Sequence, residues 1–180
     1  NYDFILIPGG FSYGDYLRAG AIARFSPIMD EVIKAANAGI PIMGICNGFQ
    51  ILIESGLLPG ALINNINVKF LSQNIVLKVA STNSIFTKNL DLNQELMMPI
   101  AHKQGNFFAS NDLIEKLEDN DQIVFKYKDN PNGSIANIAG IINNSRNVLG
   151  MMPHPERAAE SILGSSDGFS IFHSLFEYIS

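Results

Sequence analysis

The sequence predicts an α/β fold with a mostly parallel central sheet, and three observations favour it. Short apolar runs end at glycine- or proline-containing turns, as buried strands do. Helical patterns stand between the first of these runs, which indicates parallel strands with helices on the faces of the sheet. A second set of apolar runs is separated by clusters of Asn, Gly and Asp, and indicates an antiparallel or mixed extension.

The N-terminal third alternates strand and helix. Continuous apolar runs predict buried strands, and apolar residues at helical spacing predict helices that end at glycine. A Ser-Pro pair is typical of an N-cap followed by proline at the first helical position. The predicted elements are a buried strand over 4–7, a helix from Ser26-Pro27 to Gly39, a buried strand over 40–45 and a helix from about Gly48 to Gly56.

The remainder is rich in predicted strands and closes with a helix. The strands are expected over 75–79, 97–101, 122–127, 135–142 and 148–152. The last helix, capped near Ser166-Asp167, is expected to bury Phe169, Phe172, Leu175, Phe176 and Ile179. No repeat, low-complexity tract or linker interrupts the chain, so residues 1–180 are predicted to form a single domain.

Composition excludes several classes of function. Apolar residues make up 47% and charged residues 16% of 180 residues, which is typical of a soluble globular protein. No apolar run approaches the roughly 18 residues of a membrane span, and no signal peptide is expected, so we expect no membrane partner. The net charge of −5 argues against nucleic-acid binding. A lone cysteine allows neither a disulfide nor a multi-thiolate metal site, and favours a reducing, cytosolic setting.

That cysteine lies in Gly44-Ile45-Cys46-Asn47-Gly48, between a predicted strand and a predicted helix. The pattern is the thiol counterpart of the nucleophile elbow, in which two glycines permit a sharp turn. The N-terminus of the following helix favours a thiolate, and the N–H of Asn47 could hold an oxyanion. A buried structural cysteine is the competing interpretation.

The second candidate is His154-Pro155-Glu156, directly after a predicted strand. Proline biases His154 toward an extended backbone, and residues two apart in an extended segment face the same way. Glu156 could therefore orient the imidazole, which would leave the other ring nitrogen free to deprotonate Cys46. A strand-end histidine with only structural hydrogen bonds is the alternative.

The third candidate is the Pro8-Gly9-Gly10 turn, whose backbone could approach a ligand closely, with Gly10 as a second oxyanion donor. A plain tight turn is the alternative. All three candidates follow predicted strands, and ligands bind at the carboxyl edge of parallel sheets. Together they predict acyl transfer from an amide or ester through a thioester on Cys46.

Three segments, 8–20, 44–50 and 150–157, resemble the class I glutamine amidotransferases, and specifically the glutaminase subunits of phosphoribosylformylglycinamidine synthases. The resemblance covers essentially the whole chain. It implies a flavodoxin-like fold of that class. It also implies that the first strand and helix of the family are lacking here, so that the domain is incomplete at its N-terminus.

The resemblance further implies a mechanism. Cys46 attacks the side-chain amide of glutamine, His154 moves the proton, and Glu156 orients His154. The N–H groups of Gly10 and Asn47 hold the oxyanion. The remaining residues that the resemblance places against the bound glutamine are Gln50, Gly9 and, as a glutamine or channel contact, His102.

The resemblance also implies partners. Ammonia passes to a synthetase subunit that aminates formylglycinamide ribonucleotide in purine biosynthesis, and a small third subunit bridges the complex. ATP and magnesium are expected on the synthetase, with no cofactor and no metal in this chain.

One loop departs from the family. Ala101-His102-Lys103-Gln104-Gly105 has Gln104 where the family has an acidic residue, which puts substrate or subunit contacts from this loop in question. Tyr13, Asp15, Tyr16 and Arg18 are expected to line the glutamine site or the synthetase interface. His173, in the last predicted helix, is expected to be structural.

Two other functions remain open from the sequence. The first is a cysteine hydrolase of the same elbow superfamily that acts without ammonia transfer, against which the long segment after Pro8 argues. The second is a non-catalytic structural subunit, against which the presence of Cys46, His154 and Glu156 argues.

Overall fold

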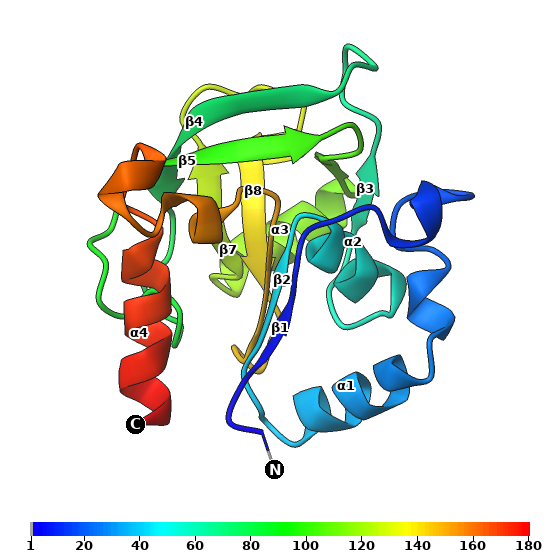
Figure 1. The fold of residues 1–180 in the computed structure, drawn as a ribbon, viewed down its shortest axis with the longest axis horizontal. Coiled ribbons are helices and arrows are strands. Elements are labelled where there is room, and N and C mark those ends of the chain that lie inside the picture. The colour runs from blue at the N-terminus through cyan, green and yellow to red at the C-terminus, as the bar shows by residue number, and fades with distance from the viewer. Residues whose placement is uncertain (1) are drawn as a thin grey trace.

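The computed structural model describes residues 2–180, which form a seven-stranded mixed sheet, a two-stranded sheet and four α-helices (Figure 1). The order of strands in the large sheet is β1-β2-β9-β8-β7-β4-β5. Their bounds are β1 Ile5–Ile7, β2 Ile42–Ile45, β9 Val148–Met151, β8 Ile138–Ile142, β7 Ile123–Tyr127, β4 Leu71–Val79 and β5 Glu95–His102.

The predicted combination of a parallel part and an antiparallel extension is confirmed. Strands β1, β2 and β9 pair in parallel, whereas β8, β7, β4 and β5 join them through antiparallel pairings. Figure 1 shows β4 and β5 crossing the end of the sheet at which β1 and β2 finish. The carboxyl ends of β1 and β2 therefore lie next to the antiparallel strands β4 and β5.

Strand β1 is less buried than its apolar sequence predicts. It lies at the edge of the sheet, where β2 is its neighbour, and Leu6 is 41% exposed. The neighbouring strand β2, which lies between β1 and β9, is by contrast buried along its whole length. Burial of a short strand depends on what packs on both sides of it, which a run of apolar residues does not reveal. Asn1, the first residue of the predicted domain 1–180, lies outside the described residues.

The helices predicted from Ser26-Pro27 to Gly39 and from about Gly48 to Gly56 are present as α1 (Ile28–Asn37) and α2 (Asn47–Glu54). At the start of α1, Pro27 already has helical dihedral angles and the carbonyl of Ser26 accepts from the N–H of Met29. Across the part of the chain described, no side-chain cap bond comes from Ser26. Gly39 ends the helix with a φ of 84°, as the sequence predicts.

The last helix, α4 (Phe169–Ile179), buries part of the face that was expected: Leu175 is buried, and Phe172 and Ile179 pack against the core. Its buried residues are Ile171, Ser174 and Leu175, whereas Phe169 and Phe176 are each 50% exposed. The helix is apolar on more than one side, so the sequence alone does not decide which side meets the sheet.

Three elements were not predicted. Helix α3 (Asn111–Asp119) buries only Ile114 and Leu117, so its apolar pattern is weak. Its N-cap is Ser110, whose hydroxyl accepts from the N–H of Leu113, and this Ser-Asn-Asp start was the available signal. Strands β3 (Ala61–Ile63) and β6 (Asn106–Phe108) pair as a separate antiparallel ribbon. Within residues 2–180, no helix combines the length and apolar character needed to cross a bilayer.

Candidate functional site

Cys46 lies at a sharp turn between β2 and α2, with φ 51° and ψ −105°. This strained conformation is rare for a residue with a side chain, and it is typical of functional positions. The flanking glycines are required by contact: a methyl group on Gly44 would lie 2.7 Å from the backbone carbon of Gly48. A methyl group on Gly48 would overlap the carbonyl oxygen of Ile7 in β1. The predicted elbow is therefore present, and close packing on β1 fixes it.

The thiol of Cys46 is buried and protonated. Burial raises the pKa of Cys46 to about 12, and it outweighs the backbone N–H of Asn47, which lowers that pKa by hydrogen bonding to the sulfur. The positive charge of Arg157 lowers the pKa further but is also outweighed. The thiol donates to the carbonyl of Ala101 in β5, at 3.6 Å. The expectation of a thiolate from the helix N-terminus alone is therefore not met, because burial has the larger effect on the pKa of Cys46.

His154, the predicted base, lies close to Cys46. Nδ1 of His154 lies 2.6 Å from Oε1 of Glu156, and the imidazole is buried. Nε2 of the same ring is buried with no hydrogen-bond partner in residues 2–180. A methyl group on Gly9 would lie 2.7 Å from Cε1 of His154 and 3.5 Å from Cβ of Cys46. The side chains of His154 and Cys46 thus both lie next to the same glycine.

The predicted reason for the His154–Glu156 contact is only partly right. His154 has φ −105° and ψ 88°, outside the regular extended region, and a 3-10 helix begins at Pro155 and runs to Ala158. Glu156 reaches the ring from this turn and not from a continued strand. The N–H of His154 donates to the carbonyl of Pro99 in β5, which fixes the turn against the antiparallel part of the sheet.

The predicted oxyanion donors lie in the loop after β1 and at the start of α2, and a hydrogen bond joins these two segments. The N–H of Asn47 points to the sulfur, while the side-chain oxygen of Asn47 accepts from the N–H of Ser12, at 3.1 Å. Gly10 has a φ of 157°, and a methyl group there would meet nothing within 4 Å. The loop that contains Gly10 is thus hydrogen-bonded to the start of α2, a junction that we call the corner of the site, and the role of both N–H groups as oxyanion donors stays a prediction.

Hydrogen bonds of the Gln50 and Gln104 side chains connect that corner to the end of β5. The side-chain oxygen of Gln50 accepts from Nδ2 of Asn47, and its Nε2 donates to the carbonyl of Gln104, at 2.9 Å and 2.7 Å. The side-chain oxygen of Gln104 accepts from the N–H of Ala19, at 2.9 Å. An amide oxygen at position 104 can accept this bond as a carboxylate oxygen would. A contact of Gln50 with substrate remains a prediction.

His102 reaches the same region from the end of β5. It is 2% exposed, and its Nδ1 lies 3.1 Å from Oδ1 of Asn65. Burial lowers its pKa to about 4, and the nearby His154 lowers it as well. Asn65 carried no signal in the sequence, because it is 37 residues from His102 and lies among other asparagines.

The loop after Gly10 is exposed. Tyr13, Tyr16 and Leu17 are more than half exposed, and Arg18 forms a two-bonded ion pair with Glu54 of α2, at 2.5 Å and 2.7 Å. Burial raises the pKa of Asp15. The loop is thus attached to the helix that follows Cys46. His173 is half exposed on α4, and its Nε2 lies 3.6 Å from Oε1 of Glu177, far along the chain from these residues.

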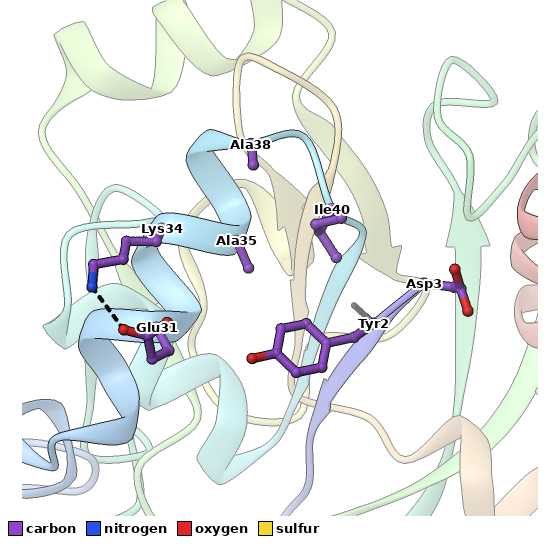
Figure 2. Close-up of a pocket in the computed structure, with 7 residues that line it drawn as sticks. All are labelled: Tyr2, Asp3, Glu31, Lys34, Ala35, Ala38 and Ile40. Carbon is purple, nitrogen blue, oxygen red and sulfur yellow. Dashed lines mark hydrogen bonds and ion pairs between the residues drawn. The ribbon is translucent and has the colours of Figure 1, made fainter.

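A cavity elsewhere in the described fold lacks the cysteine and histidine side chains that mark the first site. This cavity of about 440 Å³ lies between the start of β1 and α1, with the ring of Tyr2 beside it and the Lys34–Glu31 ion pair at its rim (Figure 2). It contains no cysteine or histidine and lies at the amino end of β1, opposite the elbow. In the stretch from residue 2 to 180, no group of three or more His, Cys, Asp or Glu side chains could hold a metal ion.

Comparison with known proteins gives a consistent result. The family model for the CobB/CobQ-like glutamine amidotransferase domain matches residues 1–178. The chain is 55% identical to phosphoribosylformylglycinamidine synthase subunit PurQ of Chlorobium luteolum over 97% of this chain and 80% of that protein. A chain in the structure of PurLQS from Thermotoga maritima is 45% identical and superposes with a TM-score of 0.92, covering 99% of this chain and 81% of that one.

More distant structures share the fold. A glutamine amidotransferase from Thermotoga maritima, only 15% identical, has a TM-score of 0.62 and covers 99% of this chain and 78% of its own length. At that identity the likeness concerns the fold alone. The predicted class I glutamine amidotransferase fold is thereby confirmed.

Proposed function

Since this chain belongs to the glutamine amidotransferase family, we propose that it is the glutaminase subunit of a phosphoribosylformylglycinamidine synthase. It hydrolyses glutamine to glutamate and ammonia. The ammonia passes to a synthetase subunit, which converts formylglycinamide ribonucleotide to formylglycinamidine ribonucleotide in purine biosynthesis. The identity of 55% to a named subunit of that enzyme supports the assignment.

The observation that best supports the chemistry is the placement of the side chains of Cys46 and His154 next to each other at Gly9. A buried thiol with a pKa of about 12 is a poor nucleophile unless a base removes its proton as it attacks. His154 has a buried nitrogen without a protein partner in the described chain, and Glu156 holds its other nitrogen. A nucleophile, a base and an orienting carboxylate are therefore present together.

In the first half of the reaction, Sγ of Cys46 attacks the amide carbon of glutamine while Nε2 of His154 takes the thiol proton. The carbonyl oxygen becomes an oxyanion held by the N–H groups of Gly10 and Asn47. Collapse breaks the carbon–nitrogen bond, and His154 returns the proton to the leaving nitrogen. Ammonia departs, and a glutamyl thioester remains on Cys46.

In the second half, water attacks the thioester and gives up its proton to His154. The carbon–sulfur bond breaks, His154 reprotonates the sulfur, and glutamate leaves. Glu156 keeps the imidazole in one tautomer through both halves.

The remaining parts of the proposal concern the surroundings of this chain. Its partners are the synthetase subunit and a small bridging subunit, ATP and magnesium act on the synthetase, and the complex works in the cytoplasm. The presence of a single, unpaired cysteine is compatible with a reducing compartment.

The test is covalent labelling. An electrophilic glutamine analogue is incubated with the chain and its synthetase partner, and the modified residue is located by mass spectrometry. We expect labelling at Cys46 that glutamine prevents and that is lost in His154→Ala. Labelling that glutamine does not prevent indicates another cysteine hydrolase, and absence of labelling indicates a structural subunit.

A further inference from the structure

His102 holds a buried nitrogen that the fold leaves unused. Its Nε2 has no hydrogen-bond partner among residues 2–180, although the side chain is 2% exposed. An unsatisfied buried acceptor costs about 1–3 kcal/mol, so such a group calls for an explanation.

The hydrogen bonds around Asn65 fix the proton on the other ring nitrogen. Nδ2 of Asn65 donates to the carbonyls of Lys69 and His102, at 2.8 Å and 2.9 Å. Its Oδ1 is therefore the acceptor, and it receives the N–H of Gly105 at 3.1 Å. Nδ1 of His102, 3.1 Å from the same oxygen, must then donate to it. In a neutral imidazole this makes Nε2 a bare acceptor.

The ring remains neutral at physiological pH. Burial and the neighbouring His154 lower the pKa of His102 to about 4. The group that satisfies Nε2 must therefore be a donor, and it must reach a buried position.

The position of His102 shows where such a donor would come from. The preceding residue, Ala101, accepts the thiol of Cys46 with its carbonyl. His154 is close enough to influence the charge on His102, and its backbone is bonded to Pro99 on the same strand. In the proposed reaction the leaving nitrogen of glutamine faces His154, which protonates it, so we place its N–H groups on the side of Cys46 along which Pro99, Ala101 and His102 of β5 run.

We propose that Nε2 of His102 accepts a hydrogen bond from the side-chain NH2 of bound glutamine, so that His102 distinguishes the amide from an acid or an ester. This rests on the proposed glutaminase function and adds a specificity residue to it. Glutamate and glutamate esters place an oxygen with lone pairs at that position, opposite the lone pair of Nε2. Binding of the amide is favoured and binding of the product is opposed.

Two substitutions separate this role from a structural one. His102→Asn keeps a donor near the position of Nδ1 for Asn65 but removes the acceptor. His102→Gln keeps an amide oxygen near the position of Nε2 but removes the bond to Asn65. If the acceptor matters, His102→Asn is the damaging change for catalysis. If only the bond to Asn65 matters, His102→Gln is.

The assay compares glutamine with the γ-methyl ester of glutamate, using the chain in complex with its synthetase subunit. We expect His102→Asn to lower kcat/KM for glutamine about tenfold or more, the value of one lost hydrogen bond of about 1.4 kcal/mol, and to raise kcat/KM for the ester, because the opposing lone pair of Nε2 is gone. Glutamate should inhibit this variant more strongly than the wild type. His102→Gln should retain most glutamine turnover.

The inference is overturned if His102→Asn lowers turnover of both substrates equally, if it changes neither, or if His102→Gln loses glutamine turnover to the same extent. Should His102→Asn fold poorly, inhibition by glutamate in His102→Gln still decides, because the retained acceptor must keep it weak. Failure of the proposed function itself is recognised separately, since wild-type Cys46 would then not be labelled by a glutamine analogue in a glutamine-sensitive way.

Discussion

The parallel and antiparallel parts of the sheet contribute to the site in different ways. Strands β1, β2 and β9 run in one direction, so the loops after them meet at one edge and bring Gly9, Cys46 and His154 together. Strand β5 reaches the same edge because its pairing with β4 sets His102 opposite Leu71. In the first part chain direction is enough to position a residue, whereas in the second the register decides.

That difference suggests a division of labour. We expect residues from the parallel part to carry out bond making and breaking, and residues from the antiparallel part to hold the corner and select the substrate. The expected effects of substitution therefore differ in kind as well as in size.

The largest effect is expected for Cys46→Ala. Removing the nucleophile should lower glutamine-dependent synthesis by at least about a thousandfold, because no other thiol is available. Synthesis from added ammonium chloride should persist, since it bypasses the chain. Both rates are measured on the complex with the synthetase. Glutamine-dependent turnover within tenfold of the wild type would disprove the assignment of Cys46.

Second is the dependence of stability on pH. The pKa of His102 is about 4 in the fold against 6.5 in the unfolded chain, so the unfolded chain binds the proton first as pH falls. Stability is unaffected above pH 6.5 and should decrease between 6.5 and 4, by up to about 3 kcal/mol.

Urea denaturation at several pH values measures this loss. Comparison with His102→Asn isolates it from the carboxylates that titrate nearby. His173→Asn is the matched control, because that histidine is half exposed on α4 and should leave the slope unchanged. Equal slopes for the wild type and His102→Asn would show that His102 is not buried as described.

Third, a matched pair of glycine substitutions compares the two parts directly. Gly9→Ala places a methyl group 2.7 Å from Cε1 of His154 and should lower turnover of glutamine and of its ester analogue alike, about a hundredfold. Gly105→Ala overlaps the ring of His102 and should mainly lower turnover of the amide. Thermal unfolding of both variants controls for loss of fold. If Gly9→Ala spared the ester, the division of labour would be wrong.

We expect Gln104 to stabilise the site by accepting a hydrogen bond from the backbone N–H of Ala19. Gln104→Leu removes the acceptor for that N–H and should cost about 1 kcal/mol of stability, with a few-fold loss of turnover. Gln104→Glu keeps an acceptor and should be close to the wild type. Chemical denaturation and steady-state kinetics measure the two effects. Equal behaviour of both variants would mean that the bond to Ala19 has no role in the site.

The sequence predicted the parallel part and its residues well. The elbow around Cys46 and the triplet at His154 are local patterns, and their meeting follows from chain direction alone. It predicted the antiparallel part only as a series of strands. Nothing in the spacing of Asn65 and His102, or of Gln104 and Ala19, indicates that they touch, because these contacts depend on register and on loop conformation.

The sequence also did not predict how deeply particular side chains are buried. The pattern before Pro8 is as apolar as that of β2, yet Leu6 is 41% exposed because β1 lies at the edge of the sheet. The same limit explains why the expected thiolate is absent. The helix N-terminus does favour a thiolate, but burial has the largest effect on the pKa of Cys46, and a local sequence motif does not reveal burial.

The smallest effect is expected for Arg18→Ala. The ion pair with Glu54 joins the exposed loop after Gly10 to the helix that follows Cys46, but Arg18 is itself more than half exposed. Such pairs contribute little to stability, about 0–1 kcal/mol, so the variant should unfold like the wild type. Because the loop bears exposed aromatic side chains beside the site, we expect a few-fold weaker stimulation of glutaminase activity by the synthetase.

Lys34→Ala is the matched control for this last change. It breaks another exposed ion pair, with Glu31 on α1, at the opposite end of β1. Titration of each variant with the synthetase, following glutamate release, gives the maximal stimulation and the concentration needed for half of it. A change confined to Arg18→Ala would connect the exposed loop to coupling between the subunits. Equal behaviour of the two variants would restrict the loop to a structural role and leave coupling to the residues that contact Cys46 directly.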